Sequence, residues 1–185
     1  MGEEKVSIRF LPFERADFDQ LIQWIPDARF LLQWGGPHFT FPLNESQLEE
    51  YIKNTNKTGA SRFINKVVDS SGVTVGHISL GSVDRHNRSA RIGKVLVGEQ
   101  KNRGQGIGRK MIKEICHISF DELNMHRVSL GVWDFNKPAI RCYEKAGFVH
   151  EGIKRDLRRF GDEYWSLCEM SILEDEWKLQ KKTTL

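Results

Sequence analysis

The residue types best suited to chemistry are concentrated in one glycine-rich stretch, between positions 103 and 110. It carries three basic residues and three alternating glycines: Arg103, Arg109, Lys110, Gly104, Gly106 and Gly108. Glycines lack Cβ atoms, so several backbone N–H groups can converge on one oxyanion. A helix that begins at Ile107 would add the partial positive charge of its N-terminus. The pattern favours a pyrophosphate site, although a tight strand-to-helix connection without a ligand stays open.

Two common phosphate motifs do not fit this stretch. A Walker A loop needs lysine and then a hydroxyl residue after its last glycine, whereas Arg109 and Lys110 follow Gly108. A Rossmann fingerprint needs a glycine at position 109 and an acidic residue at the end of the next strand. The acids at about that distance, Asp121 and Glu122, fall on the predicted helix instead. Both motifs are therefore excluded.

The elements that must position this stretch follow from the spacing of apolar residues, which alternate in strands and recur every three or four residues in helices. The expected strands span residues 6–12, 61–69, 73–83, 90–97, 127–133, 148–153 and 164–173. The expected helices span residues 18–25, 44–52, 107–122 and 137–146. This order is typical of one α/β domain with a mixed sheet.

Composition limits the class of protein. The chain has 185 residues, of which 39% are hydrophobic and 29% charged, as in a soluble globular domain. No stretch approaches the roughly 20 apolar residues of a membrane helix. The start, Met1–Lys5, lacks the apolar part of a signal peptide, so we expect a cytoplasmic protein without a membrane partner. A net charge of +3 is too small to indicate nucleic acid, yet suits an anionic ligand.

The spacing of cysteines and histidines argues against a metal centre. Cys116, Cys142 and Cys168 are far apart and odd in number, and no C-x-x-C pair exists. The six histidines form no H-x-x-H or H-E-x-x-H pattern. We therefore expect buried free thiols, no disulfide and no metal.

Two segments resemble the GNAT superfamily of acetyl-CoA-dependent N-acetyltransferases. Residues 103–108 match the family signature R/Q-x-x-G-x-G/A, which follows a strand and opens a helix. Residues 136–148 are similar to the family pattern N-x-x-[AS]-x-x-x-Y-x-x-x-G-F. The ending, residues 151–155 with Gly161 and Tyr164, is similar to the branch that contains ribosomal-protein N-terminal and spermidine acetyltransferases.

The resemblance implies a single α/β domain over residues 1–175, followed by a charged C-terminal tail over 176–185. The central sheet would be mixed and mostly antiparallel, with about 6–7 strands and helices on both faces. A V-shaped splay would separate the strand 94–98 from the strand 127–133. Backbone groups left unpaired there could bind the amides of a pantetheine arm.

The resemblance also implies the site residues, with acetyl-CoA as co-substrate and no metal. Tyr143 would be catalytic and protonate the departing CoA thiolate, since phenol and thiol pKa values lie within about two units. Other roles stay open: Asn136 as a helix N-cap, Tyr143 as a core aromatic and Arg109 on a solvated helix face. The implied acetyl-CoA contacts are Leu96, Val97, Arg103, Gly104, Gln105, Gly106, Ile107, Gly108, Arg109, Asn136 and Tyr143.

The group that accepts the amine proton is in doubt. Relatives often carry a glutamate within A-E-I-G on the central strand, whereas residues 90–93 read Ala-Arg-Ile-Gly, which places Arg91 there. Asp84, His86 and Glu99 are candidates, as are a water chain or an amine that is already deprotonated. Arg91 could instead attract an acidic acceptor.

Two further segments have open roles. The aromatic connection Trp34–Phe41 stands where the family lines its acceptor pocket, or it forms a small satellite core. The basic run, defined as Lys154, Arg155, Arg158 and Arg159, could contact an acidic partner or form a solvated hairpin rim.

The predicted function is transfer of an acetyl group from acetyl-CoA to a primary amine of a small molecule or a protein N-terminus, by direct attack. The alternative is a catalytically idle domain that binds or senses acyl-CoA. A nucleic-acid partner has little support, because no stacking aromatics are interleaved with the basic run. A homodimer stays open, and the acceptor is not identified: a protein N-terminus, a polyamine, an aminoglycoside and an amino acid all fit.

Overall fold

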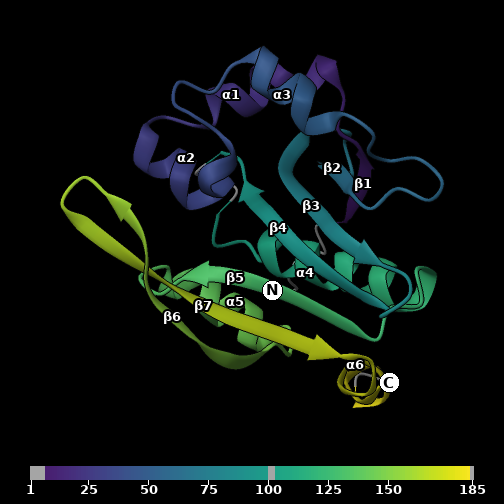
Figure 1. Ribbon diagram of the computed structural model, residues 1–185. Coiled ribbons are helices and arrows are strands. Elements are labelled where there is room, and N and C mark those ends of the chain that lie inside the picture. Colours follow the sequence, from purple (N-terminus) through teal and green to yellow (C-terminus); the bar gives the residue numbers. More distant parts are fainter. Residues whose placement is uncertain (1–6, 100–102, 184–185) are drawn as a thin grey trace. The chain divides into compact units, whose positions relative to one another are not determined.

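The computed structural model describes residues 7–99 and 103–183, and it contains a seven-stranded sheet with the order β1-β2-β3-β4-β5-β7-β6 (Figure 1). The β1–β2, β5–β7 and β6–β7 pairs are antiparallel, whereas β4 and β5 are parallel. The predicted mixed, mostly antiparallel sheet is therefore confirmed. The strands are β1 (Ile8–Pro12), β2 (Phe63–Asp69), β3 (Thr74–Asp84), β4 (Ser89–Val97), β5 (Arg127–Trp133), β6 (Val149–Phe160) and β7 (Glu163–Leu173).

The helices include two that the sequence reading did not predict, α2 and α6. Asp27 accepts a hydrogen bond of 2.7 Å from the Phe30 backbone N–H, and this N-cap starts α2 within the aromatic connection. Most of the predicted charged tail is helical, although residues 184–185 lie outside the described residues. The helices are α1 (Phe18–Gln23), α2 (Ala28–Gly35), α3 (Glu45–Ile52), α4 (Ile107–His117), α5 (Lys137–Lys145) and α6 (Glu174–Thr183), with short turns η1 (Arg15–Asp17), η2 (Gly36–His38) and η4 (Ile118–Glu122).

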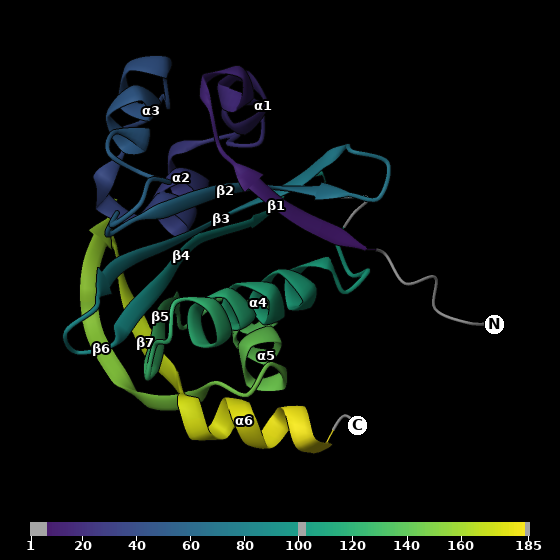
Figure 2. The same ribbon diagram turned by 90° about the vertical axis from the view of Figure 1, so that its right-hand side faces the viewer.

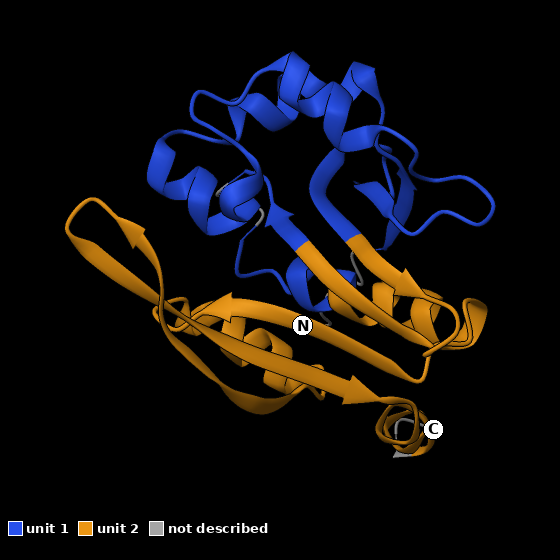
Figure 3. Cartoon of the chain, viewed as in Figure 1, with its two compact units in different colours: residues 1–79, 94–111 blue, residues 80–93, 112–185 orange. Residues whose placement is uncertain are grey.

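The chain divides into two compact units, coloured separately in Figure 3. Unit 1 comprises residues 1–79 and 94–111, and unit 2 comprises residues 80–93 and 112–185. Strands β3 and β4 and helix α4 each contribute residues to both units.

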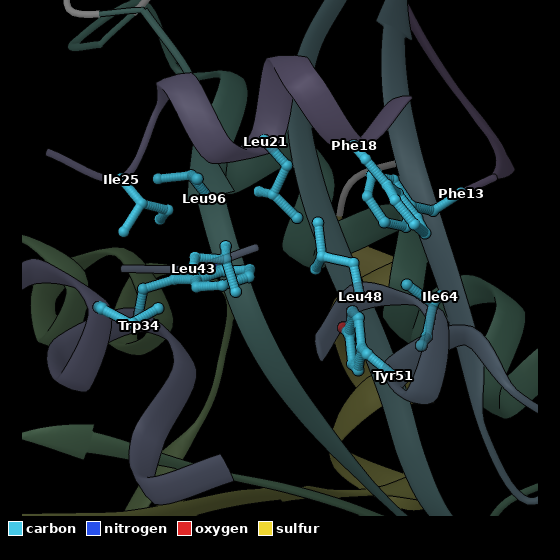
Figure 4. Packing of buried hydrophobic residues seen from close by; sticks show 11 residues of the cluster. Phe13, Phe18, Leu21, Ile25, Trp34, Leu43, Leu48, Tyr51, Ile64 and Leu96 are labelled. Carbon is cyan, nitrogen blue, oxygen red and sulfur yellow. The ribbon is translucent and has the colours of Figure 1, made fainter. Parts of the chain in front are cut away.

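In unit 1, three helices bury their apolar faces against the sheet. Helices α1, α2 and α3 lie on one face of the β1–β2 strands (Figure 2), and their side chains meet those of β2 and β4 (Figure 4). The burial of this apolar surface is the main force that holds the unit together. The labelled core residues are Phe13, Phe18, Leu21, Ile25, Trp34, Leu43, Leu48, Tyr51, Ile64 and Leu96.

In unit 2, α5 lies along one face of β5 and β7 (Figures 1 and 2). Trp177 of α6 is buried, stacks on Phe120 at 5.8 Å between ring centroids and donates a 3.2 Å hydrogen bond to Asp121. This burial explains why the charged tail folds as a helix. Strand β6 is longer than the predicted 148–153, and it contains two register shifts.

The three cysteines are thiols and not disulfide partners, with Cys116 and Cys168 buried and Cys142 half-buried. Burial raises the pKa of the Cys116 thiol, which keeps it protonated and unreactive. Among the described residues, no cluster of three or more histidine, cysteine or acidic side chains could hold a metal ion. No described helix is long and apolar enough to span a bilayer.

Candidate functional site

The glycine turn of unit 1 exposes bare backbone ahead of α4. Gly104 and Gly106 have φ angles of +78° and +77°, a region that favours glycine because it is strained for residues with a Cβ. A Cβ added to either residue would meet no atom within 4 Å. The Gly106 carbonyl accepts a 3.1 Å hydrogen bond from the Lys110 N–H, within the first turn of α4. Open space beside exposed backbone, at the N-terminus of an 11-residue helix, suits an anion.

Arg103 ties the turn back to the end of β4. Its Nε donates to the Val97 carbonyl at 3.3 Å, and its Nη2 donates to the Gly98 carbonyl at 3.2 Å. Its guanidinium also lies 6.0 Å from the Phe30 ring centroid. The Arg103 side chain therefore positions the turn, rather than only offering a charge to a ligand.

The end of β4 is held closely by its neighbours. The Gly98 N–H donates to the Val75 carbonyl at 2.9 Å, and a Cβ at Gly98 would lie 2.2 Å from the Trp24 ring. The Leu96 side chain is buried in the core, so only its backbone is available to a ligand. Gly98 is thus required by packing, a constraint that the motif alone does not reveal.

The remaining turn residues have different exposures. Ile107 is buried and anchors the first turn of α4, while Gly108 is half-buried. Gln105 and Arg109 are exposed. The exposure of Arg109 fits a solvated helix face, and it equally leaves the guanidinium accessible to a phosphate.

Helix α5 of unit 2 carries the second predicted pair. The Asn136 side chain accepts a 3.3 Å hydrogen bond from the Ala139 N–H, so Asn136 is the helix N-cap as predicted. Tyr143 is buried, and its ring centroid lies 6.2 Å from that of Phe148. Burial raises the pKa of the Tyr143 phenol, so the group keeps its proton at neutral pH.

The predicted acetyl-CoA contacts fall into two groups. The nine residues between Leu96 and Arg109 belong to unit 1, on one continuous segment from β4 to α4. Asn136 and Tyr143 belong to unit 2, at the start and on the buried face of α5. The parallel β4–β5 register ends at the pair Ile92 and Leu130, while β4 continues to Val97.

Arg91, which stands in place of the strand acid, has a carboxylate partner on β7. Its Nη1 and Nη2 donate to Glu169 at 2.8 and 3.1 Å, and Lys154 Nζ donates to Glu169 at 2.8 Å. A Cβ at Gly131 would lie 2.5 Å from the Arg91 guanidinium, so the absence of a side chain at Gly131 leaves room for the Arg91 side chain. Burial alone would raise the pKa of Glu169, but the hydrogen bonds from Arg91 and Lys154 outweigh it and lower that pKa.

The other candidate bases are weak proton acceptors or solvated groups. The Asn87 N–H and side-chain amide donate to Asp84 at 2.9 and 2.8 Å and lower the pKa of its carboxyl. His86 and Glu99 are exposed. Every described carboxyl group whose pKa is clearly shifted has a pKa below its usual value.

Sequence reasoning missed a cluster of polar groups within the aromatic residues of unit 1, which we call the Lys94 chamber. It is formed by Trp34, Phe39, Tyr51, His77 and Lys94. Trp34 and Phe39 stack with ring centroids 5.7 Å apart, and the Trp34 indole donates to the Lys94 carbonyl at 2.9 Å. The Lys94 ammonium lies 5.6 and 5.2 Å from the Phe39 and Tyr51 ring centroids.

The polar groups of the Lys94 chamber are electrostatically coupled. Burial, and then the nearby charge of Arg62, lower the pKa of Lys94 to about 8. Burial, and then Lys94, lower the pKa of His77 to about 3, so its imidazole is neutral. His77 Nε2 and the Tyr51 hydroxyl share a hydrogen bond of 3.1 Å. His77 Nδ1 has no hydrogen-bond partner among the described residues.

The basic run lies on β6, where all four side chains are exposed. Lys154 pairs with Glu169 at 2.8 Å, and Arg159 pairs with Asp162 at 3.4 Å. These contacts favour a solvated hairpin rim over a binding surface for an acidic partner.

Comparisons with known proteins identify the family of this chain. The family model described as an acetyltransferase (GNAT) domain matches residues 7–149. The SPbeta prophage-derived uncharacterized N-acetyltransferase YokL of Bacillus subtilis is 30% identical, over 95% of this chain and 94% of its own length. The spermidine N(1)-acetyltransferase of Vibrio cholerae is 30% identical over 71% of this chain and 74% of its own length.

Solved structures share the fold. A Vibrio cholerae spermidine N-acetyltransferase in complex with CoA and spermine superposes with a TM-score of 0.79 at 23% identity, over 92% of this chain and 98% of that one. A dodecameric structure of spermidine N-acetyltransferase from the same organism matches with a TM-score of 0.69 at 23% identity, over 94% of this chain and 96% of that one. The family match and the full-length relative establish that this chain belongs to the GNAT acetyltransferases and is an N-acetyltransferase that acts on an amine.

Proposed function

We propose that the chain transfers the acetyl group of acetyl-CoA to a primary amine by direct attack. The observation that carries this proposal is the exposed glycine turn, with positive φ at Gly104 and Gly106, ahead of α4. When bound, acetyl-CoA supplies an activated thioester. Its pyrophosphate would be held by the backbone of residues 103–108 with the Arg109 guanidinium, and its pantetheine arm by the backbone of Leu96 and Val97 and by Asn136.

Tyr143 is the proposed proton donor. Its phenol is buried and protonated, and it becomes a catalytic acid by giving the hydroxyl proton to the sulfur that leaves the acetyl group. The backbone N–H near Val97 would donate to the acyl oxygen. Arg103 holds the carbonyls of Val97 and Gly98, which keeps the end of β4 in a fixed conformation.

The amine must lose a proton before it attacks, and the structure favours a reaction without a strong carboxylate base. The carboxyls of Asp84 and Glu169 have lowered pKa values, so they are poor proton acceptors at neutral pH. The kcat/KM for an alkylamine should therefore rise with pH toward the pKa of the amine itself. A plateau set by an enzyme group near pH 6–7 would contradict this and redirect attention to His86 or Glu99.

Two measurements test the proposed function. Acetyl-CoA at concentrations well above its Kd should raise the melting temperature by mass action on the folded state, whereas free acetate should not. Release of CoA in the presence of a panel of amines should then exceed release without them. Absence of any thermal shift with millimolar acetyl-CoA would overturn the proposal. A shift without amine-dependent CoA release would indicate a binding or sensing domain.

We also propose that the chain associates with copies of itself, because a protein of the same fold has a dodecameric structure. A homodimer is the smallest such assembly. Light scattering coupled to gel filtration measures the mass directly, and a monomer mass of 21.4 kDa at all concentrations would exclude the homodimer.

A further inference from the structure

The Lys94 chamber differs from an aromatic cluster that only fills space. Tyr51 is buried in the core of unit 1, yet its ring lies 5.2 Å from the Lys94 ammonium and its hydroxyl shares a hydrogen bond with the neutral His77 imidazole. The buried Trp34 ring packs on the same imidazole, with ring centroids 5.5 Å apart. Burial of a charge or an unpaired polar group costs free energy, so such groups are rare in a cluster whose only role is packing. The His77 Nδ1 atom, without a partner among the described residues, adds to this cost.

Among the described residues, the charge of Lys94 is offset only by the faces of two aromatic rings. In the described part of the chain, no carboxylate lies within ion-pair distance of Lys94, and the charged neighbour that shifts its pKa is Arg62, another cation. The acids of α3 are engaged elsewhere: Glu45 and Glu49 pair with Arg15, and Glu50 pairs with Lys53. Residues 28–44, which supply Trp34 and Phe39, contain no aspartate or glutamate.

Such a chamber suits a ligand that brings negative charge. An anion beside Lys94 would offset the repulsion from Arg62 and restore an ion pair, with the Phe39 and Tyr51 rings excluding water around it. A polyamine would bring a second ammonium group to the same place and increase the repulsion. The charge distribution of unit 1 therefore differs from what a polycationic acceptor requires.

We propose that Lys94, flanked by Phe39 and Tyr51, binds a carboxylate on the acceptor, so that the substrates are amines carrying an acidic group. This inference rests on the proposed acetyl transfer and specifies its substrate class. Lys94 precedes Val97 by three residues on β4, which corresponds to about 10 Å along a strand. An acceptor with its amine at the acetyl group near Val97 and its carboxylate at Lys94 needs a spacer of similar length.

Three amines with the same six-carbon chain differ only in the group at the end opposite the reacting amine, so they test the effect of its charge. They are 6-aminohexanoate, hexylamine and 1,6-diaminohexane, which end in a carboxylate, a methyl group and an ammonium. The wild-type kcat/KM should be highest for 6-aminohexanoate and at least about tenfold lower for 1,6-diaminohexane, which corresponds to about 1.4 kcal/mol. A preference for 1,6-diaminohexane would overturn the proposal.

Variants of Lys94 test whether this residue sets the preference. Lys94→Met should bring the ratio of kcat/KM for 6-aminohexanoate to that for hexylamine close to one, while Lys94→Arg should keep the preference. Lys57→Met is the matched control, because Lys57 is exposed and its ammonium donates a hydrogen bond to the Asn54 side chain, and it should leave the ratio unchanged. An unchanged ratio in Lys94→Met, in a variant that still folds by circular dichroism, would overturn the assignment.

A binding measurement separates this inference from the proposed function. Titration calorimetry should detect 6-aminohexanoate binding to the wild type and to Lys94→Arg, and a loss of about tenfold in affinity for Lys94→Met. If no amine releases CoA but this pattern of binding holds, the transfer proposal fails and the Lys94 site stands. Equal binding by wild type and Lys94→Met would overturn the site whatever the turnover.

Discussion

Arg91 and Lys94 lie three residues apart on β4, but their charged groups have different kinds of partner. Arg91, in unit 2, donates two hydrogen bonds to Glu169, and Glu169 also accepts one from Lys154. Lys94, in unit 1, has two aromatic rings and a nearby cation in place of a carboxylate. A charge paired with a carboxylate is already neutralised within the fold, whereas a cation that contacts only aromatic rings can still gain an ion pair from a ligand.

The same contrast extends to other polar groups of the two units. In unit 2, Arg127 donates to Glu151 at 2.6 and 2.7 Å, and Ser171 donates to the same carboxylate at 2.8 Å. These hydrogen bonds lower the pKa of Glu151 to about 2. In unit 1, the glycine turn presents exposed backbone without side chains over it. Unit 1 is therefore the better candidate for ligand recognition, and Tyr143 is the main exception in unit 2.

The largest effect is expected for a variant of Tyr143, the main exception in unit 2. Tyr143→Phe keeps the ring and its packing on Phe148 and removes only the hydroxyl. The kcat should fall by roughly 10²–10⁴-fold, the usual range for loss of a general acid, while acetyl-CoA affinity stays within a few fold. Steady-state kinetics and an acetyl-CoA titration measure both. Full activity with intact binding would assign Tyr143 to the core and leave unit 2 without a catalytic residue.

A matched pair of glycine variants compares the units directly. Gly106→Val and Gly161→Val both place a branched side chain at positive φ, with nothing within 4 Å of the new Cβ. The backbone strain should be similar, of order 1–3 kcal/mol in each. Stabilisation by acetyl-CoA should disappear only in Gly106→Val, because its side chain would cover the backbone that holds the pyrophosphate. Equal thermal shifts in both variants would exclude the turn as the binding site.

The pH dependence of stability reports on Lys94. Its pKa of about 8 in the folded chain lies below the ordinary 10.5, so the unfolded chain binds more protons between these values. Stability should therefore rise across this range, by up to about 1.4 kcal/mol per pH unit, from the Lys94 contribution. Urea unfolding at pH 7–10 should show that contribution in the wild type and in Lys57→Met but not in Lys94→Met. Parallel curves for all three proteins would show that Lys94 is not perturbed.

The smallest effect is expected for the paired charges. Glu169→Gln removes the carboxylate shared by Arg91 and Lys154, and it should lower the free energy of unfolding by about 1–2 kcal/mol because the pair is only partly buried. The kcat should change by no more than about twofold, since Glu169 is assigned to structure. Asp162→Asn, in the exposed pair with Arg159, should leave stability unchanged. A large fall in kcat with intact stability would give the Glu169 network a chemical role.

Local sequence patterns predicted the elements that carry the candidate site. Strand β5 spans the predicted 127–133, and α4 with η4 together cover the predicted 107–122. The N-cap role of Asn136 followed from its position before Lys137 and Pro138. These features depend on neighbours within a few residues, which is why periodicity and capping residues identify them.

Contacts between distant segments were not predictable in the same way. Lys94 and His77 lie within two of the predicted strands, and the chamber forms only when α2 and α3 pack over them. The Arg91–Glu169 pair joins residues 78 positions apart. Helix α6 was missed because its apolar face is narrow and its stability depends on Trp177 packing on Phe120. The available signal for the chamber was a histidine in the middle of a strand whose neighbouring residues are mostly apolar.

Strand β6 has a consequence for aggregation. It is a twelve-residue strand at the edge of the sheet, and exposed apolar side chains such as Val149, Ile153 and Leu157 lie along it. A long edge of this kind is a template for pairing with another chain. The two register shifts and the four cations of the basic run interrupt that template and make two copies repel each other. Neutralising the basic run should therefore lower the protein concentration at which the chain precipitates.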